Sequence, residues 1–315
     1  MKRPENLAFR LGTGLFGLIL VVLVATIGVE LFRQSWLSIQ KFGLNFWRTS
    51  TWDPVAGEFG ALPFIWGTLY SSVLALVMAA PIALGISVFI SELCPNRIKP
   101  ALVFLTELLA AIPSIVYGLW GIFVLVPAVR SLEASVPAAW KSIPFFTGPP
   151  FGLGMLSAAL ILAVMVIPFT SSVAREVLKA VPVAQREGAY ALGATRFEAI
   201  SAALYYARTG IVGAVLLGFG RALGETMAVT MVIGNNPQIS LSLFAPQHTM
   251  SAALANEFSE AADPLYLSSL IEIGLVLFII TLVVNSLSRL LIWSMARPLK
   301  QAAATTVVPA VESAA

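Results

Sequence analysis

The chain has 315 residues, of which 58% are hydrophobic and 11% are charged, and its mean hydropathy is +0.89. Soluble domains carry about 25% charged residues, so this composition excludes a water-soluble globular fold and indicates that the bilayer is the solvent. The formal net charge of only +3 argues against nucleic acid as a partner, and the single cysteine, Cys94, excludes an intrachain disulfide and a thiolate metal site.

Six apolar stretches are each long enough to cross a bilayer as an α-helix, which takes about 20 residues. In chain order they are Leu11–Phe32, Leu62–Ile90, Ala101–Val129, Phe151–Ala174, Gly210–Ile233 and Tyr266–Ile292. The sequence therefore predicts an all-α integral membrane fold, a polytopic bundle of six helices. The first stretch follows basic residues, as in a signal peptide, but it is long and lacks a small-x-small cleavage site, so we expect a retained helix.

Lysine and arginine gather in alternate loops, and this asymmetry predicts the orientation. One side holds Lys2, Arg3, Arg10, Arg97, Lys99, Arg175, Lys179, Arg186, Arg196, Arg208, Arg289, Arg297 and Lys300, and the other holds Arg33, Lys41, Arg48, Arg130 and Lys141. Both termini are therefore expected on the cytoplasmic side. Two outer loops, 33–61 and 131–150, are rich in aromatic residues, which indicates either an aromatic belt at the headgroups or a docking surface for an external partner.

Four ionisable residues lie deep in the apolar stretches, namely Glu107, Arg221, Glu225 and Glu272. A charge near the centre of a spanning helix costs about 2.5–3.5 kcal/mol on insertion scales, so each of them needs a partner or a function. Arg221 and Glu225 are four residues apart and are expected on one helical face. Gly220 and Gly224 beside them allow another helix to approach closely, which predicts that this face points into the bundle.

Two interpretations of the charged pair are open. It is either an internal ion pair that locks helices together, or a site where Arg221 contacts an anionic substrate while Glu225 holds the arginine and offsets its charge. A guanidinium group suits a phosphate-like oxyanion because its planar fork donates two parallel hydrogen bonds. Glu107 and Glu272 are further candidates for the substrate path, or else carboxylates bonded to neighbouring helices.

The segment Val173–Arg208 is the longest inner loop and the richest in charge. Pro182 can start a short helix there, small residues follow Glu187, and Gly193 can end the helix or turn the chain. A helix with an Ala and Gly face has little bulk and fits a groove of another protein. The alternative is an amphipathic helix lying on the inner leaflet.

No catalytic motif is evident in the chain. It contains no Gly-Lys dipeptide, and therefore no P-loop of the GxxxxGK[ST] kind, so energy for transport must come from another subunit or from an ion gradient. The sole histidine, His248, lies in an outer loop without nucleophile signals nearby, and we expect an ordinary polar residue there.

The stretch from Glu187 to Gly193 resembles the EAA loop of type I ABC importer permeases, whose pattern is Glu, Ala, Ala, three residues, Gly. Gly188 replaces the first alanine of the pattern, and Ala189 matches the second. The usual apolar-x-Leu-Pro ending is absent, because Ala203–Tyr206 stands in its place. In that family the loop is a coupling helix that docks on the ATP-hydrolysing subunit.

Three other segments narrow the resemblance. They are similar to the corresponding segments of PstC-type permeases of the phosphate-specific (Pst) importers, and they comprise Gly220–Asn235, Glu107–Gly118 and Ser251–Ala261. Carried over by position, Arg221 and Glu225 match the charged pair that this family is thought to require for phosphate movement.

The resemblance implies a domain organisation and a set of partners. Residues 62–297 would form the type I permease domain, with its coupling loop at 174–209; residues 1–61 would precede it as a helix and outer loop, and 298–315 would follow as a disordered cytoplasmic tail. The chain would be a multi-pass subunit of the bacterial cytoplasmic membrane that imports inorganic phosphate. Its implied partners are a homologous second permease subunit, two ATP-binding subunits that use ATP and Mg, and an extracytoplasmic phosphate-binding protein. No cofactor is expected on this chain.

Other functions stay open at this point. A permease for sulfate or molybdate would also use an arginine, because these oxyanions resemble phosphate in shape and charge. A gradient-driven secondary transporter or channel could use Glu107, Glu225 and Glu272 as a proton or cation relay, and would stop when the proton gradient collapses. For a membrane sensor or scaffold, Arg221→Gln should leave solute flux unaltered.

Overall fold

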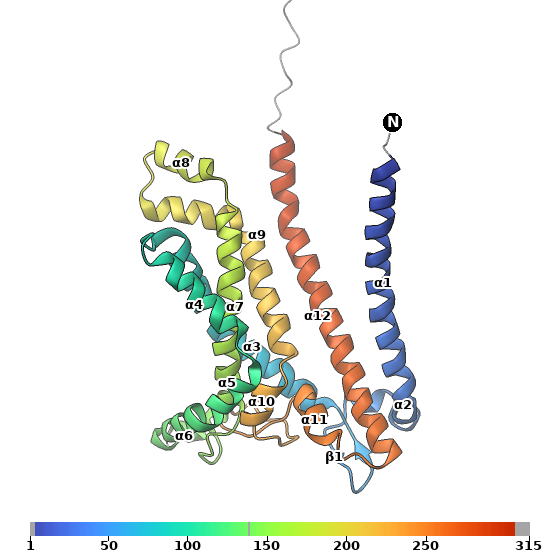
Figure 1. Ribbon diagram of the computed structural model, residues 1–315. Helices are drawn as coiled ribbons and strands as arrows, with labels where there is room; N and C mark the ends of the chain where they lie inside the picture. The colour runs from blue at the N-terminus through green and yellow to red at the C-terminus, as the bar shows by residue number, and fades with distance from the viewer. Residues whose placement is uncertain (1–3, 138, 306–315) are drawn as a thin grey trace, which may run out of the picture.

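The computed structural model describes residues 4–137 and 139–305, which are mostly α-helical (Figure 1). Within them, six helices are long and apolar enough to cross a membrane, as predicted, namely Phe9–Gln34, Leu62–Leu93, Ser114–Ser135, Met155–Lys179, Arg196–Leu223 and Pro264–Met295. The first, second, fourth and sixth lie close to the predicted stretches. The third and fifth do not.

The elements follow one another with few long loops. The N-terminal part comprises α1 (Pro4–Gln34), α2 (Trp36–Phe42), a 3₁₀ turn (Gly43–Trp47) and a hairpin of β1 (Trp52–Asp53) and β2 (Glu58–Phe59), in which Trp52 pairs with Phe59. Then come α3 (Leu62–Val88), a π-helical turn (Phe89–Leu93), α4 (Lys99–Ala111), α5 (Ser114–Trp120), a second π-helical turn (Gly121–Leu125) and α6 (Val126–Ser135). Two 3₁₀ turns (Trp140–Ser142 and Pro144–Phe146) lead to α7 (Met155–Lys179), α8 (Val183–Ala191), α9 (Arg196–Leu223), α10 (Met227–Val232), α11 (Met250–Glu257) and α12 (Pro264–Thr305).

Helix α7 lies at the centre of the bundle, where it contacts α3, α4 and α9. Glycines of α9 allow close approach: a Cβ atom at Gly210 would lie 2.5 Å from a methyl carbon of Val177, and one at Gly218 would overlap the hydroxyl of Thr170. Association of helices in lipid depends on such close packing, because lipid chains are as apolar as the side chains. The small residues therefore account for the tight α7–α9 pair.

The third predicted span is interrupted at Ile112 and Pro113. Proline lacks an N–H group and disfavours the helical conformation of the residue before it, and Ile112 is accordingly extended, with ψ 131°. The prediction of one helix over Ala101–Val129 is therefore wrong: α4 ends at Ala111, and the spanning helix is Ser114–Ser135.

The fifth predicted span, Gly210–Ile233, is also wrong in its limits. Helix α9 begins at Arg196, on a capping box formed by Thr195 and Glu198, and ends at Leu223. A short irregular segment separates it from α10. At the other end of the chain, α12 runs through Pro298 to Thr305, so 298–305 are helical rather than disordered; 306–315 lie outside the described residues.

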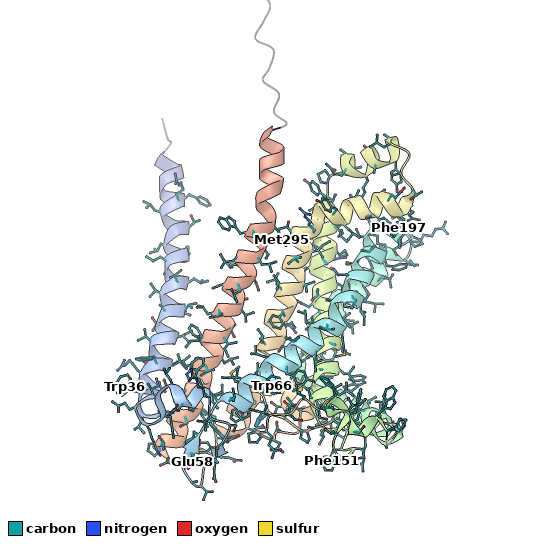
Figure 2. All side chains as sticks on the ribbon, turned by 180° about the vertical axis from the view of Figure 1, so that it is seen from behind. Trp36, Glu58, Trp66, Phe151, Phe197 and Met295 are labelled. Carbon is teal, nitrogen blue, oxygen red and sulfur yellow. The ribbon has the colours of Figure 1, made fainter. Side chains whose placement is uncertain are left out.

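The aromatic loop before α3 forms a packed cluster. The Trp52 ring lies 4.9 Å from Phe59 and 4.8 Å from Phe64, and Phe59 stacks on Tyr266 of α12. These side chains therefore join the hairpin to two spanning helices, whereas Trp36 remains half exposed. Figure 2 places Trp36, Glu58 and Phe151 at one end of the molecule and Phe197 and Met295 toward the other, and α8 shares the latter end with the start of α1 and the end of α12 (Figure 1).

Candidate functional site

Arg221 lies in the last turn of α9, immediately before a break in the fifth span. Gly224 ends the helix with φ −92° and ψ 2°, and α10 begins only at Met227. Non-helical backbone at membrane depth is tolerated only where protein buries it or where it lines a water-filled cavity. The break therefore leaves polar backbone groups within the bundle, next to Arg221.

The Arg221 guanidinium has no carboxylate partner among the described residues. Its central carbon lies 5.5 Å from the ring centroid of Phe169, and its Nε atom is buried without a hydrogen-bond partner. The charge of Arg221 also interacts with Tyr117 of α5. The Tyr117 hydroxyl donates a hydrogen bond to the carbonyl of Leu109 at 2.8 Å, across the break in the third span. A buried donor without an acceptor is costly, and an oxyanion would supply that acceptor.

Glu225 lies beyond the helix end, so the expectation that it shares a helical face with Arg221 is wrong. Its carboxylate accepts a hydrogen bond from the Ala228 N–H at 3.4 Å, and its backbone carbonyl accepts one from the Ser251 hydroxyl at 2.7 Å. Within the described chain no ion pair joins Glu225 to Arg221. Glu225 instead fixes the first turn of α10 and its contact with α11.

The two interrupted spans meet at α5 and α10. A Cβ atom at Gly118 would lie 3.1 Å from the Cα atom of Ala228 and 2.6 Å from the sulfur of Met231. Only glycine allows this approach without displacement. The two breaks in the fold thus lie on helices that contact each other, with Arg221 at the end of one of them.

The other two predicted path residues lie elsewhere. Glu107 on α4 is half exposed and accepts a hydrogen bond from Arg175 of α7 at 2.8 Å. Glu272 on α12 is buried beside the Ser38 hydroxyl of α2, and one of its oxygens has no partner. No described contact connects either carboxylate with Arg221.

Arg175 is a buried charge that is absent from the predicted site, because it follows an apolar stretch and the sequence predicts a loop residue there. It lies within α7, is 3% exposed, and contacts Glu107 and Glu176 through one nitrogen, while its Nε and Nη1 atoms have no partner. Its place directly after the apolar stretch was the available signal, but only the fold shows that α7 continues past it and that α4 contacts α7 there.

The predicted coupling segment forms an exposed knob at one end of the molecule. Glu187, Gly188 and Ala189 lie on α8, which has no buried residue, and Gly193 turns the chain after it with φ +84°, a conformation that favours glycine. A Cβ atom at Gly188 would meet nothing within 4 Å, so the departure from the alanine pattern has no effect on packing within the chain.

Large apolar side chains are exposed around this knob. Leu192 is 91% exposed and Phe197 is 79% exposed, and Val183 and Tyr190 are also exposed. The loop exit at 203–206 simply continues α9, with Ala203 buried against Leu178. Such a group of apolar side chains at the end of a helical bundle marks a contact surface.

His248 is buried, contrary to expectation. It is 2% exposed, lies against Phe64, and places its Nε2 atom 3.6 Å from the Glu257 carboxylate. Burial raises the pKa of Glu257, but interactions with His248 and hydrogen bonds from Tyr266 and Trp52 outweigh burial and leave that pKa below its usual value. This cluster fastens the α11 segment to the aromatic hairpin.

Comparison with known proteins adds relatives of known class. Residues 83–297 match the family described as binding-protein-dependent transport system inner membrane component. The chain is 43% identical to the phosphate transport system permease protein PstC of Mesorhizobium japonicum over 287 residues, covering 89% of this chain and 88% of that protein. It is 46% identical to the PstC protein of Haemophilus influenzae, covering 91% and 93% of the two chains.

More distant relatives share the architecture. The probable PstC protein of Methanocaldococcus jannaschii is 38% identical, over 79% of this chain and 81% of that one. A solved structure of the MetNI methionine ABC transporter, in an inward-facing conformation, superposes with a TM-score of 0.57 at 15% identity, over 74% of this chain and 94% of that chain. The likeness shows the permease fold of an ABC importer. In this chain the third and fifth spans, which the sequence predicts to be continuous helices, are interrupted.

Proposed function

The chain belongs to the family of binding-protein-dependent transport system inner membrane components, and we propose that it is the permease subunit of an ATP-driven importer of inorganic phosphate, with Arg221 in contact with the anion. The observation that carries this proposal is the unpaired guanidinium at the break between α9 and α10. The PstC proteins of Mesorhizobium japonicum and Haemophilus influenzae, which are similar over about nine-tenths of this chain, support phosphate over other oxyanions.

The geometry at Arg221 suits passage rather than storage of an anion. The guanidinium offers an unused N–H donor, and hydrogen bonds to charged groups contribute about 1.5–3 kcal/mol each. Arg221 is the only arginine of the described residues at the break between α9 and α10, and no ion pair holds it to Glu225. A conducting site must bind its solute weakly enough to release it, and this arrangement meets that condition.

The α8 end of the molecule is proposed to be cytoplasmic and to receive the ATPase subunits. The excess of Lys and Arg in the segments at this end supports the orientation. Exposed apolar side chains there, including Leu192 and Phe197, suit a groove in a soluble partner, and Glu187 is exposed beside them. Because the chain has no P-loop sequence, ATP with Mg would be hydrolysed by that partner, in the cytoplasmic membrane of a bacterium.

A groove between α9 and α12 is the proposed seat of the second permease subunit. It has a volume of about 760 Å³ and is lined by Gly213, Leu217, Asn285 and Arg289, among others. Neither Asn285 nor Arg289 makes a hydrogen bond or ion pair with another described residue, and an amide facing lipid at this depth would be costly. A spanning helix with polar side chains would satisfy both.

The groove can be tested by crosslinking. With Cys94→Ser removing the only native thiol, Asn285→Cys should crosslink to cysteines placed along a spanning helix of the second permease. Val55→Cys is the matched control, because Val55 is 98% exposed on the hairpin, away from the groove. Labelling of Asn285→Cys by a lipid-soluble maleimide in the assembled complex, without crosslinks, would contradict the assignment.

The function itself is tested in proteoliposomes that contain this chain, the second permease, the ATPase and an external phosphate-binding protein. We expect uptake of labelled phosphate only with all components and internal ATP, and no inhibition by excess sulfate or molybdate. Uptake by this chain alone, or uptake abolished by a protonophore while ATP is plentiful, would refute an ATP-driven mechanism.

A further inference from the structure

Glu92 lies at the end of α3, in the π-helical turn Phe89–Leu93, where it is largely buried. Its side chain is 11% exposed, and its carboxylate faces the coupling helix α8 rather than water. No local sequence signal distinguishes Glu92, because it lies at the edge of an apolar stretch, where a carboxylate ordinarily reaches the aqueous phase.

Arg186 of α8 binds this carboxylate through two bonds. Its Nη2 atom lies 2.6 Å from Oε1 of Glu92, and its Nε atom lies 3.2 Å from Oε2. The same guanidinium donates to the carbonyl of Leu178 in the last turn of α7 and to that of Val181 just after it, each at 3.0 Å. Such a forked pair fixes both distance and orientation, which a single bond does not.

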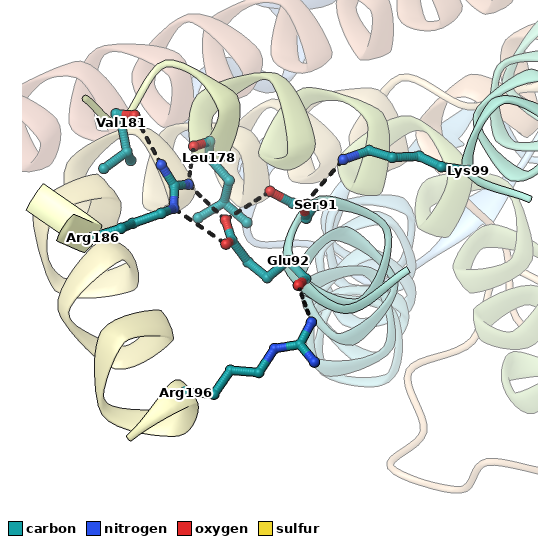
Figure 3. A network of polar contacts seen from close by, with 7 residues as sticks. All are labelled: Ser91, Glu92, Lys99, Leu178, Val181, Arg186 and Arg196. Carbon is teal, nitrogen blue, oxygen red and sulfur yellow. Dashed lines mark hydrogen bonds and ion pairs between the residues drawn. The ribbon is translucent and has the colours of Figure 1, made fainter. Parts of the chain in front are cut away.

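Two further segments converge on the same turn (Figure 3). Arg196, the first residue of α9, donates to the backbone carbonyl of Glu92 at 2.7 Å, and Lys99, the first residue of α4, donates to that of Ser91 at 3.1 Å. The Ser91 hydroxyl also donates to the Glu92 carboxylate at 2.9 Å. Helix α8 buries no side chain, so the Arg186 contacts are its principal polar link to the spanning helices.

Helix α3 connects this turn to the break at Glu225. At its other end, the Thr68 hydroxyl accepts a hydrogen bond from the Met250 N–H at 2.9 Å, at the start of α11. The next residue, Ser251, donates to the backbone carbonyl of Glu225 at 2.7 Å. A displacement of α3 along its axis therefore reaches the segment between Arg221 and α10 through two short hydrogen bonds.

We propose that Glu92 is the positioning residue that transmits movement of the coupling helix to α3, and through Thr68 and Ser251 to the Glu225 segment beside the anion site. The inference rests on the proposed function, since it assigns the route by which ATP hydrolysis in a partner would reach the substrate. In this proposal Glu92 acts through its ion pair with Arg186 and not by contact with the anion.

The test measures phosphate transported per ATP hydrolysed by the complete importer in proteoliposomes. Glu92→Gln keeps the shape of the side chain and removes its charge. We expect the complex to assemble and hydrolyse ATP, while phosphate per ATP falls at least tenfold. The charge exchange Glu92→Arg with Arg186→Glu should restore part of the ratio. Glu176→Gln is the matched control, because its partners Arg175 and Lys179 lie on its own helix, and its ratio should not change.

The outcomes distinguish transmission of movement by Glu92 from a purely structural role of its ion pair with Arg186. If the Glu92→Gln complex assembles and its ratio of phosphate to ATP is unchanged, whether or not both rates fall in parallel, the proposal is overturned. If Glu92→Gln does not assemble, Glu92→Asp retains the charge but shortens the reach: a reduced ratio supports transmission, and an unchanged ratio or a further failure to assemble overturns it. If the wild-type importer transports another anion, the proposal of phosphate as the substrate is wrong. The number of those anions transported per ATP hydrolysed then still tests the role of Glu92.

Discussion

Replacing Arg221 with glutamine should strongly reduce transport and leave the protein folded. Within the described chain the guanidinium has no ion pair, and its ring contact with Phe169 at 5.5 Å contributes about 0.5–1 kcal/mol. Loss of stability should therefore stay below about 1 kcal/mol. A hydrogen bond to a charged anion contributes about 1.5–3 kcal/mol, and each 1.4 kcal/mol is a factor of ten, so uptake should fall roughly 10- to 150-fold.

The assay is the initial rate of phosphate uptake by the complete importer, alongside its melting temperature in detergent. Arg208→Gln is the matched control, since Arg208 lies on the same helix, stacks on Tyr205 at 4.2 Å and also has a buried Nε without a partner, but lies far from the break. Arg221→Lys, which keeps the charge and loses the planar fork, should fall between the two. An Arg221→Gln complex that melts early or does not assemble, or one that transports normally, would refute the reasoning.

Three other variants follow from the structure. Because the pKa of Glu257 is lowered, its interactions with His248 and others stabilise the fold above the unfolded pKa of about 4.3 and are lost as pH falls through the lower folded value. The melting temperature should therefore drop below about pH 4, and less steeply in Glu257→Gln. In Gly67→Ala the added Cβ atom would overlap the His248 carbonyl, so this variant should destabilise the protein by about 1–3 kcal/mol. Gly188→Ala, where the added Cβ atom meets nothing within 4 Å, should stabilise α8 by up to about 1 kcal/mol. Thermal melts of the two variants beside the wild type check both expectations. Glu107→Gln removes one half-exposed carboxylate from the buried Arg175, which keeps Glu176 as a partner, so phosphate uptake should fall less than about fivefold. A tenfold loss would return Glu107 to the substrate path.

The sequence predicted the number of spanning helices because hydrocarbon demands long apolar segments, and that demand is local. It did not predict where the third and fifth spans break. Pro113 was visible, but proline is tolerated inside other spans of this chain, as at Pro81 in α3 and Pro168 in α7. Whether a proline interrupts a helix depends on whether neighbours satisfy the freed backbone groups, as the Tyr117 hydroxyl does for the Leu109 carbonyl. Such neighbours are set by the tertiary fold.

The residues of the candidate site likewise differ in whether a local sequence signal or only the tertiary fold identifies them. Arg221 and the predicted coupling segment each have a signal in the sequence, because a charge in an apolar stretch is costly and the stretch from Glu187 to Gly193 resembles the EAA loop. The contacts of these residues have no such signal. Spacing along a helix predicts a contact only if the helix continues, and α9 ends between Arg221 and Glu225. The link between Glu92 and Arg186 spans 94 positions and joins two residues that look individually like ordinary charges at a membrane boundary. The proposed anion contact at Arg221 therefore has a signal in the sequence, whereas the proposed transmission route, which consists of such long-range pairs, is readable only from the fold.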